Sequence, residues 1–256
     1  MDRIKIFQKE LNTITDPEIK QFAEELINNA PEYFFQVPAS STGKYHPTYA
    51  LGDGGLVRHT KAVVRFYNHI MSLEQNKFYE SYEVDCGIVA CLAHDMMKSG
   101  PEDYYNQQVA DGKKVYTVFN HPLIAAEYIT KINTNIRPEY VKLISDLISS
   151  HMGEWNTSKQ SSVVLPKPTS DLQQLVHLAD YLASRKDIEV IFDDDEKTIE
   201  TPDMDKAVCP FKKYKGMLFK NIAEQDPDYL VWLYNNVDLK EPTKSIVKYF
   251  TKIECK

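Results

Sequence analysis

The chain has 256 residues, of which 43% are hydrophobic and 26% charged, with 9 Gly and 13 Pro. This composition excludes a fibrous repeat and a wholly disordered chain, and the length suits one large domain, with or without a small appendage. The formal net charge of -7 weighs against tight binding of duplex nucleic acid unless Lys and Arg gather on one face. No apolar run is long enough to cross a bilayer and residues 1–10 form no signal peptide, so we expect a cytoplasmic protein without membrane contact.

Apolar residues recur at helical spacing along most of the chain, which predicts a mainly α fold. The first helix is predicted to begin at Asp16 and Pro17, within an N-terminal segment covering residues 1–39. A loop rich in Ser, Gly and Pro follows, and its glycines at positions 52, 54 and 55 are expected to let the backbone turn into the next helix. Further helices are predicted at residues 56–73, 82–97, 122–132, 138–149 and 170–186.

The pattern departs from helical spacing in two places. Between Tyr104 and Phe119, a polar stretch and an Asp-Gly pair precede an apolar run, which predicts a short β-hairpin close to the functional cleft. An acidic run at residues 191–206 is predicted to be a linker. We therefore expect a main domain at residues 40–190 and a small C-terminal domain, α or α+β, at residues 207–256.

Histidine and aspartate residues recur at or near the predicted ends of helices: His59, His94, Asp95, His121, His151 and Asp180. Helix ends can converge on one point. Because adjacent residues diverge by about 100° around a helix, His94 and Asp95 can hold one ion from two sides, or the carboxylate can bridge two ions. Any single histidine more often has a structural role, so it is the set that indicates a metal site.

In its sequence context this set resembles the HD-domain superfamily of metal-dependent phosphohydrolases. The matching segments are GGLVRHT with His59, CLAHDMMK with His94 and Asp95, NHPLIAAEYI with His121, ISSHMGEW with His151, and LVHLADYL with Asp180. The resemblance covers about residues 40–187 and implies a helical bundle with these six metal ligands. Superfamily members that keep both intermediate histidines usually hold two ions bridged by the Asp of the pair. This implies two divalent cations here, of Mn, Fe, Co or Ni, with Mg possible.

The resemblance extends to other functional side chains. Lys98 matches the Lys that often follows the His-Asp pair and is expected to bind phosphate beside Asp95. His46 and Lys44 precede the first ligand, where they can donate to a substrate phosphate or a leaving oxygen. Glu154 and Trp155 are expected to line the substrate pocket, with Trp155 stacking on a base. We place the remaining histidines, His69 and His177, outside the metal shell.

Within the superfamily, these motifs are most similar to bacterial HD-domain 3'-5' exoribonucleases, although those carry an N-terminal OB-type domain for which residues 1–39 leave no room. Residues 209–239 resemble a small domain attached to DNA exonucleases and found in phage proteins, with Lys212 in place of its usual Gly. We expect hydrolysis of a phosphodiester in a single-stranded nucleic acid 3' end or a small nucleotide, by a metal-activated water. The alternatives are a nucleotide phosphatase or triphosphohydrolase, a di-iron oxygenase of the same fold, and a binding protein with a vestigial site. The oligomeric state stays open.

Overall fold

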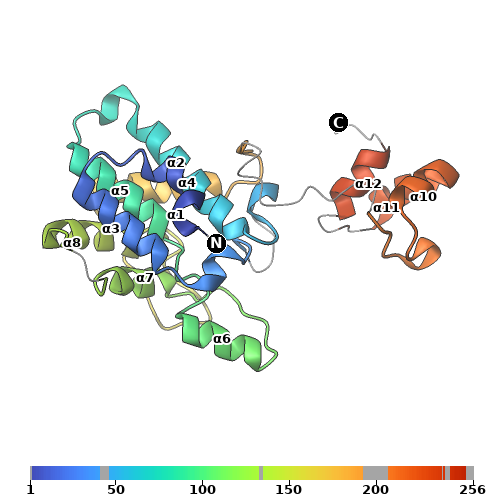
Figure 1. Cartoon of the computed structure of the whole chain (residues 1–256), viewed down its shortest axis with the longest axis horizontal. Helices are drawn as coiled ribbons and strands as arrows, with labels where there is room; N and C mark the ends of the chain where they lie inside the picture. The colour runs from blue at the N-terminus through green and yellow to red at the C-terminus, as the bar shows by residue number, and fades with distance from the viewer. Residues whose placement is uncertain are drawn as a thin grey trace. The chain divides into compact units, whose positions relative to one another are not determined.

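Helix α5 (Ser81–Ala93), which is apolar throughout from Cys86 onward, runs through the centre of the first of two compact units into which the chain divides (Figure 1). The units are Met1–Glu196 and Lys197–Lys256. The structure, a computed structural model, describes residues 2–40, 46–132, 135–192, 207–237, 239 and 243–251. A helix without a polar face is stable only when neighbours cover it. Helices α3 (Pro17–Asn28), α4 (Gly55–Met71), α8 (Pro138–Ser149) and α9 (Asp171–Ala183) pack around α5 and provide that cover.

The protein is mainly helical, as the sequence predicts. The remaining α-helices of the first unit are α1 (Arg3–Ile6), α2 (Gln8–Leu11), α6 (Glu102–Ala110) and α7 (His121–Ile129), with 3-10 turns at Glu32–Phe35, Thr48–Ala50 and Glu74–Asn76. The predicted helices are confirmed, with ends within a few residues of those expected. Asp16 caps α3 by accepting from the amide of Glu18 at 2.8 Å, and Ser170 and Gln173 form a capping box at the start of α9.

The N-terminal helices share one hydrophobic core with the helices that carry the histidines. Phe7, Leu11 and Phe22 are fully buried in that core. The carboxylate of Asp85, on α5 and 1% exposed, accepts hydrogen bonds from the amide and hydroxyl of Thr15 at 3.0 and 2.9 Å and from the amide of Asp16 at 2.7 Å. A single buried carboxylate therefore joins the start of α3 to the central helix.

The β-hairpin predicted over Tyr104–Phe119 is wrong. Residues Glu102–Ala110 form α6, and the apolar run Val115–Phe119 forms no strand. The Asp-Gly pair closes α6 instead of joining two strands: Gly112, at φ +67°, and Lys113 donate their amides to carbonyls in the last turn of the helix, at 3.0 and 2.9 Å. A glycine in the left-handed region terminates a helix as readily as it turns a hairpin, and local pattern alone does not separate the two.

The described part of the second unit is also helical. It contains α10 (Phe219–Gln225), α11 (Pro227–Asn236) and α12 (Thr243–Thr251), a 3-10 turn at Lys212–Tyr214, and an isolated antiparallel bridge between Val208 and Leu218. Phe219, Leu230 and Val247 are fully buried in its separate core. Most of the acidic run predicted as a linker, residues 193–206, lies outside the described residues.

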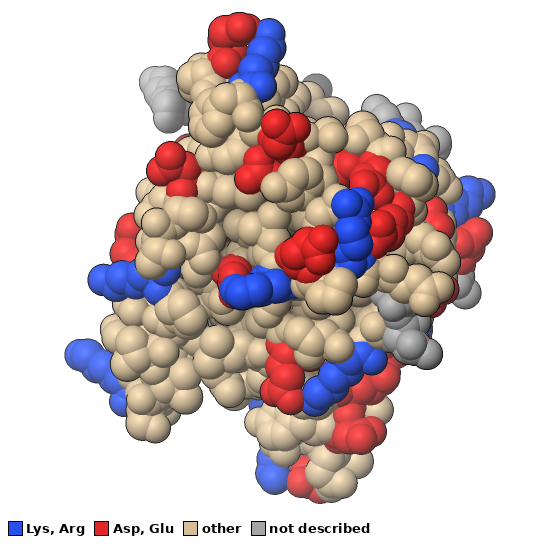
Figure 2. All heavy atoms as spheres, turned by 90° about the vertical axis from the view of Figure 1, so that its left-hand side faces the viewer, with Lys and Arg blue, Asp and Glu red and all other residues tan. Residues whose placement is uncertain are grey.

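Charged side chains of both signs are interspersed on the face that lies at the left of Figure 1 (Figure 2). Among the residues described on this face, Lys and Arg do not gather into one patch. The negative net charge is therefore not offset by a basic surface on this side of the molecule. Within the described ranges, no helix has both the length and the apolar character needed to span a membrane.

Candidate metal centre

A loop of unusual backbone geometry brings His59 to the buried side of α4. Gly52 and Gly54 have φ values of +67°, which L side chains rarely adopt. A Cβ on Gly55 would lie 2.3 Å from a main-chain oxygen of the loop, so this position tolerates only glycine. Arg58, 2% exposed, donates to three loop carbonyls at 2.5 to 2.9 Å. The loop is thus held from inside the fold, one residue before His59.

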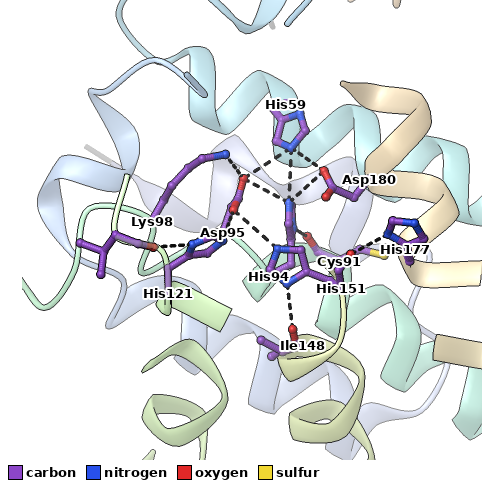
Figure 3. A network of polar contacts seen from close by, with 11 residues as sticks. His59, Cys91, His94, Asp95, Lys98, His121, Ile148, His151, His177 and Asp180 are labelled. Atoms are coloured by element: carbon purple, nitrogen blue, oxygen red, sulfur yellow. Dashed lines mark hydrogen bonds and ion pairs between the residues drawn. The ribbon is translucent and has the colours of Figure 1, made fainter. Parts of the chain in front are cut away.

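The ends of three helices meet α4, near its start, and α9, near its end, at one buried point. Helix α5 ends one residue before His94, and Asp95 follows in the same turn. His121 begins α7, and His151 follows the C-cap of α8. Asp180 comes from α9. The structure brings these side chains together, and Figure 3 shows them gathered around Asp95.

Three of the histidines are oriented in the same way. Nδ1 of His94, His121 and His151 lies 2.8, 2.7 and 2.8 Å, respectively, from the carbonyl oxygen of the residue three positions earlier. A carbonyl only accepts hydrogen bonds, so Nδ1 carries the hydrogen and Nε2 keeps its lone pair. This is the tautomer in which an imidazole binds a metal through Nε2, with a main-chain acceptor fixing the ring.

The two carboxylate oxygens of Asp95 face two different groups of histidines (Figure 3). Oδ2 lies 3.6 Å from Nε2 of His59 and 3.4 Å from Nε2 of His94. Oδ1 lies 3.0 Å from Nε2 of His121 and 3.9 Å from Nε2 of His151. Asp95 therefore lies between two sets of potential ligands and has one oxygen for each.

Asp180 completes the first group. Its Oδ1 is 3.1 Å from Nε2 of His59 and 3.7 Å from Nε2 of His94, and these two nitrogens are 3.3 Å apart. In the second group, Nε2 of His121 and Nε2 of His151 are buried with no hydrogen-bond partner among the described residues. A buried polar atom without a hydrogen bond lowers the stability of the folded protein by about 1–3 kcal/mol.

These residues fit divalent metal ions. His59, His94 and Asp95, and separately Asp95, His121 and His151, each offer ligand atoms within 4.8 Å of one another. Imidazole nitrogens and carboxylate oxygens suit first-row divalent metals. A cation in the second group would satisfy the Nε2 atoms of His121 and His151, which have no hydrogen-bond partner among the described residues.

The electrostatics of the cluster favour cation binding at neutral pH. Burial lowers the pKa of His151 to about 3, so its ring is neutral. At Asp95, burial raises the pKa, but the positive charges of Lys98 and His94 outweigh it and hold the pKa of the carboxyl well below its usual range. At His94, burial lowers the pKa, but Asp95 outweighs it and raises the pKa. The cluster thus offers an ionised carboxylate and imidazole nitrogens to a cation, and binding of a metal ion at His94 competes with protonation of that ring.

Two further predicted residues border the first group. The ammonium of Lys98 pairs with Oδ2 of Asp95, and its side chain is 13% exposed. The ring of His46 packs against the ring of His59, with centroids 5.2 Å apart at 70°. Burial, together with the positive charges of His59 and Lys98, lowers the pKa of His46 to about 3. His46 is therefore a neutral imidazole beside the cluster.

The residues predicted to bind the substrate do not all lie beside the cluster. Trp155 is 44% exposed and stacks on Tyr181, with ring centroids 5.6 Å apart at 7°. Glu154 is exposed, and no polar contact found among the described residues joins it to the cluster. Lys44 lies outside the described residues. Tyr181, which directly follows Asp180, was not predicted from the sequence, and His177 was expected to lie outside the metal shell.

Comparison with known proteins identifies the family to which the chain belongs. The family model of the HD domain matches residues 56–185, just over half of the chain. The chain therefore belongs to the HD domain family. No curated protein and no solved structure matches it significantly. Family membership, together with the His and Asp cluster, indicates a metal-dependent phosphohydrolase that binds a divalent cation.

Proposed function

We propose that this protein hydrolyses a phosphodiester bond, in a single-stranded nucleic acid 3' end or a small nucleotide, at a centre that holds two divalent ions. The observation that carries this proposal is the position of Asp95, with Oδ1 3.0 Å from His121 and Oδ2 3.4 Å from His94. A carboxylate with a ligand group on each oxygen is the arrangement that a bridging ligand requires. Two ions held by these residues would supply an activated water and would neutralise charge on the phosphoryl group.

The side chains beside the metal ligands are suited to binding the substrate phosphate and to donating to a leaving oxygen. Lys98 carries a positive charge at the partly exposed edge of the cluster, and we assign it to binding the substrate phosphate. His46 is neutral, and its buried Nδ1 has no hydrogen-bond partner among the described residues. Such an imidazole can donate to a leaving oxygen or orient His59. We assign Lys44 to phosphate binding, and Glu154 to the wall of the substrate pocket.

Two features support a single-stranded nucleic acid as the substrate. The motifs around His59 and His151 are similar to those of HD-domain 3'-5' exoribonucleases. The second unit exposes Trp232 by 52%, and the ammonium of Lys213 lies 5.0 Å from the ring centroid of Tyr229. Lysine beside aromatic rings suits an unpaired strand.

A nucleotide phosphatase or triphosphohydrolase is the second candidate. The net charge of -7 and the interspersed charges in Figure 2 favour a substrate with few phosphates over a long polyanion. The two candidates use the same centre and differ in what lies beyond the scissile phosphate.

A substrate panel tests the proposal. Protein loaded with Mn2+ is incubated with labelled single-stranded RNA and DNA, cyclic dinucleotides, and nucleoside mono- and triphosphates. Turnover should depend on the metal, and Asp95→Asn should abolish it while the helical circular dichroism spectrum persists. His69→Asn, at an exposed position of α4, is the matched control and should leave turnover unchanged. Wild-type turnover in Asp95→Asn would refute the proposal.

A further inference from the structure

We infer that Trp155, Tyr181 and Arg185 form a nucleobase-binding platform beside the metal centre, so that the substrate carries a base next to the phosphate that is cleaved. The inference rests on the proposed phosphohydrolase function and adds the chemical group that the enzyme recognises. Tyr181 and Arg185 have no other role in the site.

The platform begins where the centre opens to solvent. Asp180 is the most exposed of the six clustered side chains, at 18%, whereas His59, His94, Asp95, His121 and His151 are between 0% and 4% exposed. A ligand therefore reaches the centre along the side on which Asp180 lies. Residues three and four apart share one face of a helix. On α9, Asp180 and Tyr181 lie three and four residues after His177, and Arg185 lies four residues after Tyr181, just beyond the end of the helix at Ala183, so these side chains form a stripe that leads away from the opening.

The stripe is held rigidly against the metal ligands. Nδ1 of His177 donates to the main-chain oxygen of His151 at 2.7 Å, a contact visible in Figure 3. The ring of His177 also fills the space where a Cβ on Gly153 would lie, 2.3 Å away. The turn from His151 to Trp155 is therefore fastened to α9. Trp155 lies at the end of this turn, with its ring 5.7 Å from the ring of His177 and 5.6 Å from that of Tyr181.

The chemical groups of the platform match a nucleobase. Trp155 is 44% exposed although it stacks on Tyr181, so a large part of the indole is available to a ligand. The guanidinium of Arg185 lies 4.3 Å from the ring centroid of Tyr181. Its Nε is buried without a hydrogen-bond partner, and no carboxylate pairs with it among the described residues. An aromatic surface beside a guanidinium that has no carboxylate partner among the described residues can stack on a base and donate to a base carbonyl or a neighbouring phosphate.

Fluorescence of Trp155 tests the inference independently of catalysis. The chain has two tryptophans, so Trp232→Phe leaves Trp155 as the only one. This Mg2+-loaded variant is titrated with AMP and with ribose 5-phosphate, and affinities are measured in parallel by calorimetry. AMP should quench the fluorescence saturably and bind about tenfold or more tighter than ribose 5-phosphate, as expected if base stacking contributes about 1.4 kcal/mol or more. Ribose 5-phosphate should not quench.

Substitutions then locate the base. Trp155→Leu, Tyr181→Leu and Arg185→Gln should each weaken AMP binding about tenfold and leave ribose 5-phosphate binding within about twofold. Trp155→Phe keeps an aromatic ring and should retain most of the AMP affinity. Phe78→Leu removes an aromatic residue that is 70% exposed between α4 and α5, and should change neither affinity.

Failure of this inference and failure of the proposed function give different results. Equal affinities for AMP and ribose 5-phosphate, or equal losses of both in the platform variants, would overturn the platform even if the protein hydrolyses phosphodiesters. Saturable quenching of Trp155 by AMP, with the expected losses, would support the platform. That support would hold even if no phosphoester were hydrolysed with any metal, a result that would refute the proposed function alone.

Discussion

His177 donates a hydrogen bond from Nδ1 to the main-chain oxygen of His151, 2.7 Å away, and so joins α9 to the turn that follows α8. The two elements serve different halves of the candidate centre. Asp180 on α9 belongs to the group around His59, whereas His151 belongs to the group around Oδ1 of Asp95. A contact between side chain and main chain, outside the cluster itself, therefore sets the spacing of its two halves.

Gly153→Ala should disturb this joint. The position has φ +56°, and the new Cβ would lie 2.3 Å from the ring of His177, so either the ring or the turn must move. We expect a loss of about 1–3 kcal/mol in the free energy of unfolding, measured in urea with chelator present, and a lower metal content. Gly112→Ala is the control, because it has φ +67° but nothing within 4 Å of the new Cβ. Equal losses in the two variants would show that the contact with His177 contributes nothing.

The number of bound metal ions per chain should depend on both groups of ligands around Asp95. We expect two ions per chain in metal-saturated protein and one in His121→Ala or His151→Ala, because each change removes a ligand from the group at Oδ1 of Asp95. Asp95→Ala should lower the occupancy of both sites. Elemental analysis after gel filtration measures this, with His69→Ala as the control. One ion per chain in wild-type protein, unchanged in these variants, would disprove a binuclear centre.

Asp85→Ala should destabilise the first unit without affecting metal binding. It removes the buried acceptor of three hydrogen bonds from Thr15 and Asp16 and leaves their donors without this partner. We expect a loss of about 3 kcal/mol in the free energy of unfolding, measured in urea. Glu127→Gln breaks an exposed pair with Lys131 and should cost less than about 0.5 kcal/mol. If the two variants unfold alike, Asp85 does not hold α3 to α5.

The thiols of the central helix should be inert in the native state. Burial raises the pKa of Cys86 to about 12 and raises the pKa of Cys91 well above its usual value, so both thiols stay protonated at pH 8. The thiolate is the reactive form. In a Cys209→Ser, Cys255→Ser background, labelling with a chromogenic disulfide at pH 8 should follow unfolding in urea. Fast labelling of folded protein would contradict the placement of α5 at the centre of the core.

A chain truncated after Glu196 should separate catalysis from strand binding. All six clustered residues and Lys98 lie in the first unit, so hydrolysis of a small phosphodiester should persist. Turnover of an oligonucleotide should fall, with a loss that shrinks at high salt, because contacts between Lys and phosphate are screened. Equal loss on both substrates would indicate a packing role for the second unit. Unchanged turnover of the oligonucleotide would favour the nucleotide phosphatase.

Local signals in the sequence determine most helix positions. Asp16, and Ser170 with Gln173, lie at helix starts because their side chains satisfy amides that the first turn leaves free, and Pro17 suits the first turn because it has no amide hydrogen to satisfy. The same signals fail between Tyr104 and Phe119, where a glycine at position 112 suits either a hairpin or the end of a helix. That choice depends on whether a partner strand exists, which is a property of the whole fold.

Some features of the candidate centre can likewise be predicted from the sequence, and others depend on the tertiary structure. By itself, the sequence determined which His and Asp residues belong together, since their order and neighbours carry the HD-domain pattern. Only the tertiary structure decided that Asp95 directs one oxygen to each of two groups, that His177 joins α9 to the turn at His151, and that Tyr181 lies under Trp155. These relations join residues from different helices. They arise because α4, α5, α8 and α9 bury their apolar faces together, and that packing fixes distances which the spacing of residues along the chain does not contain.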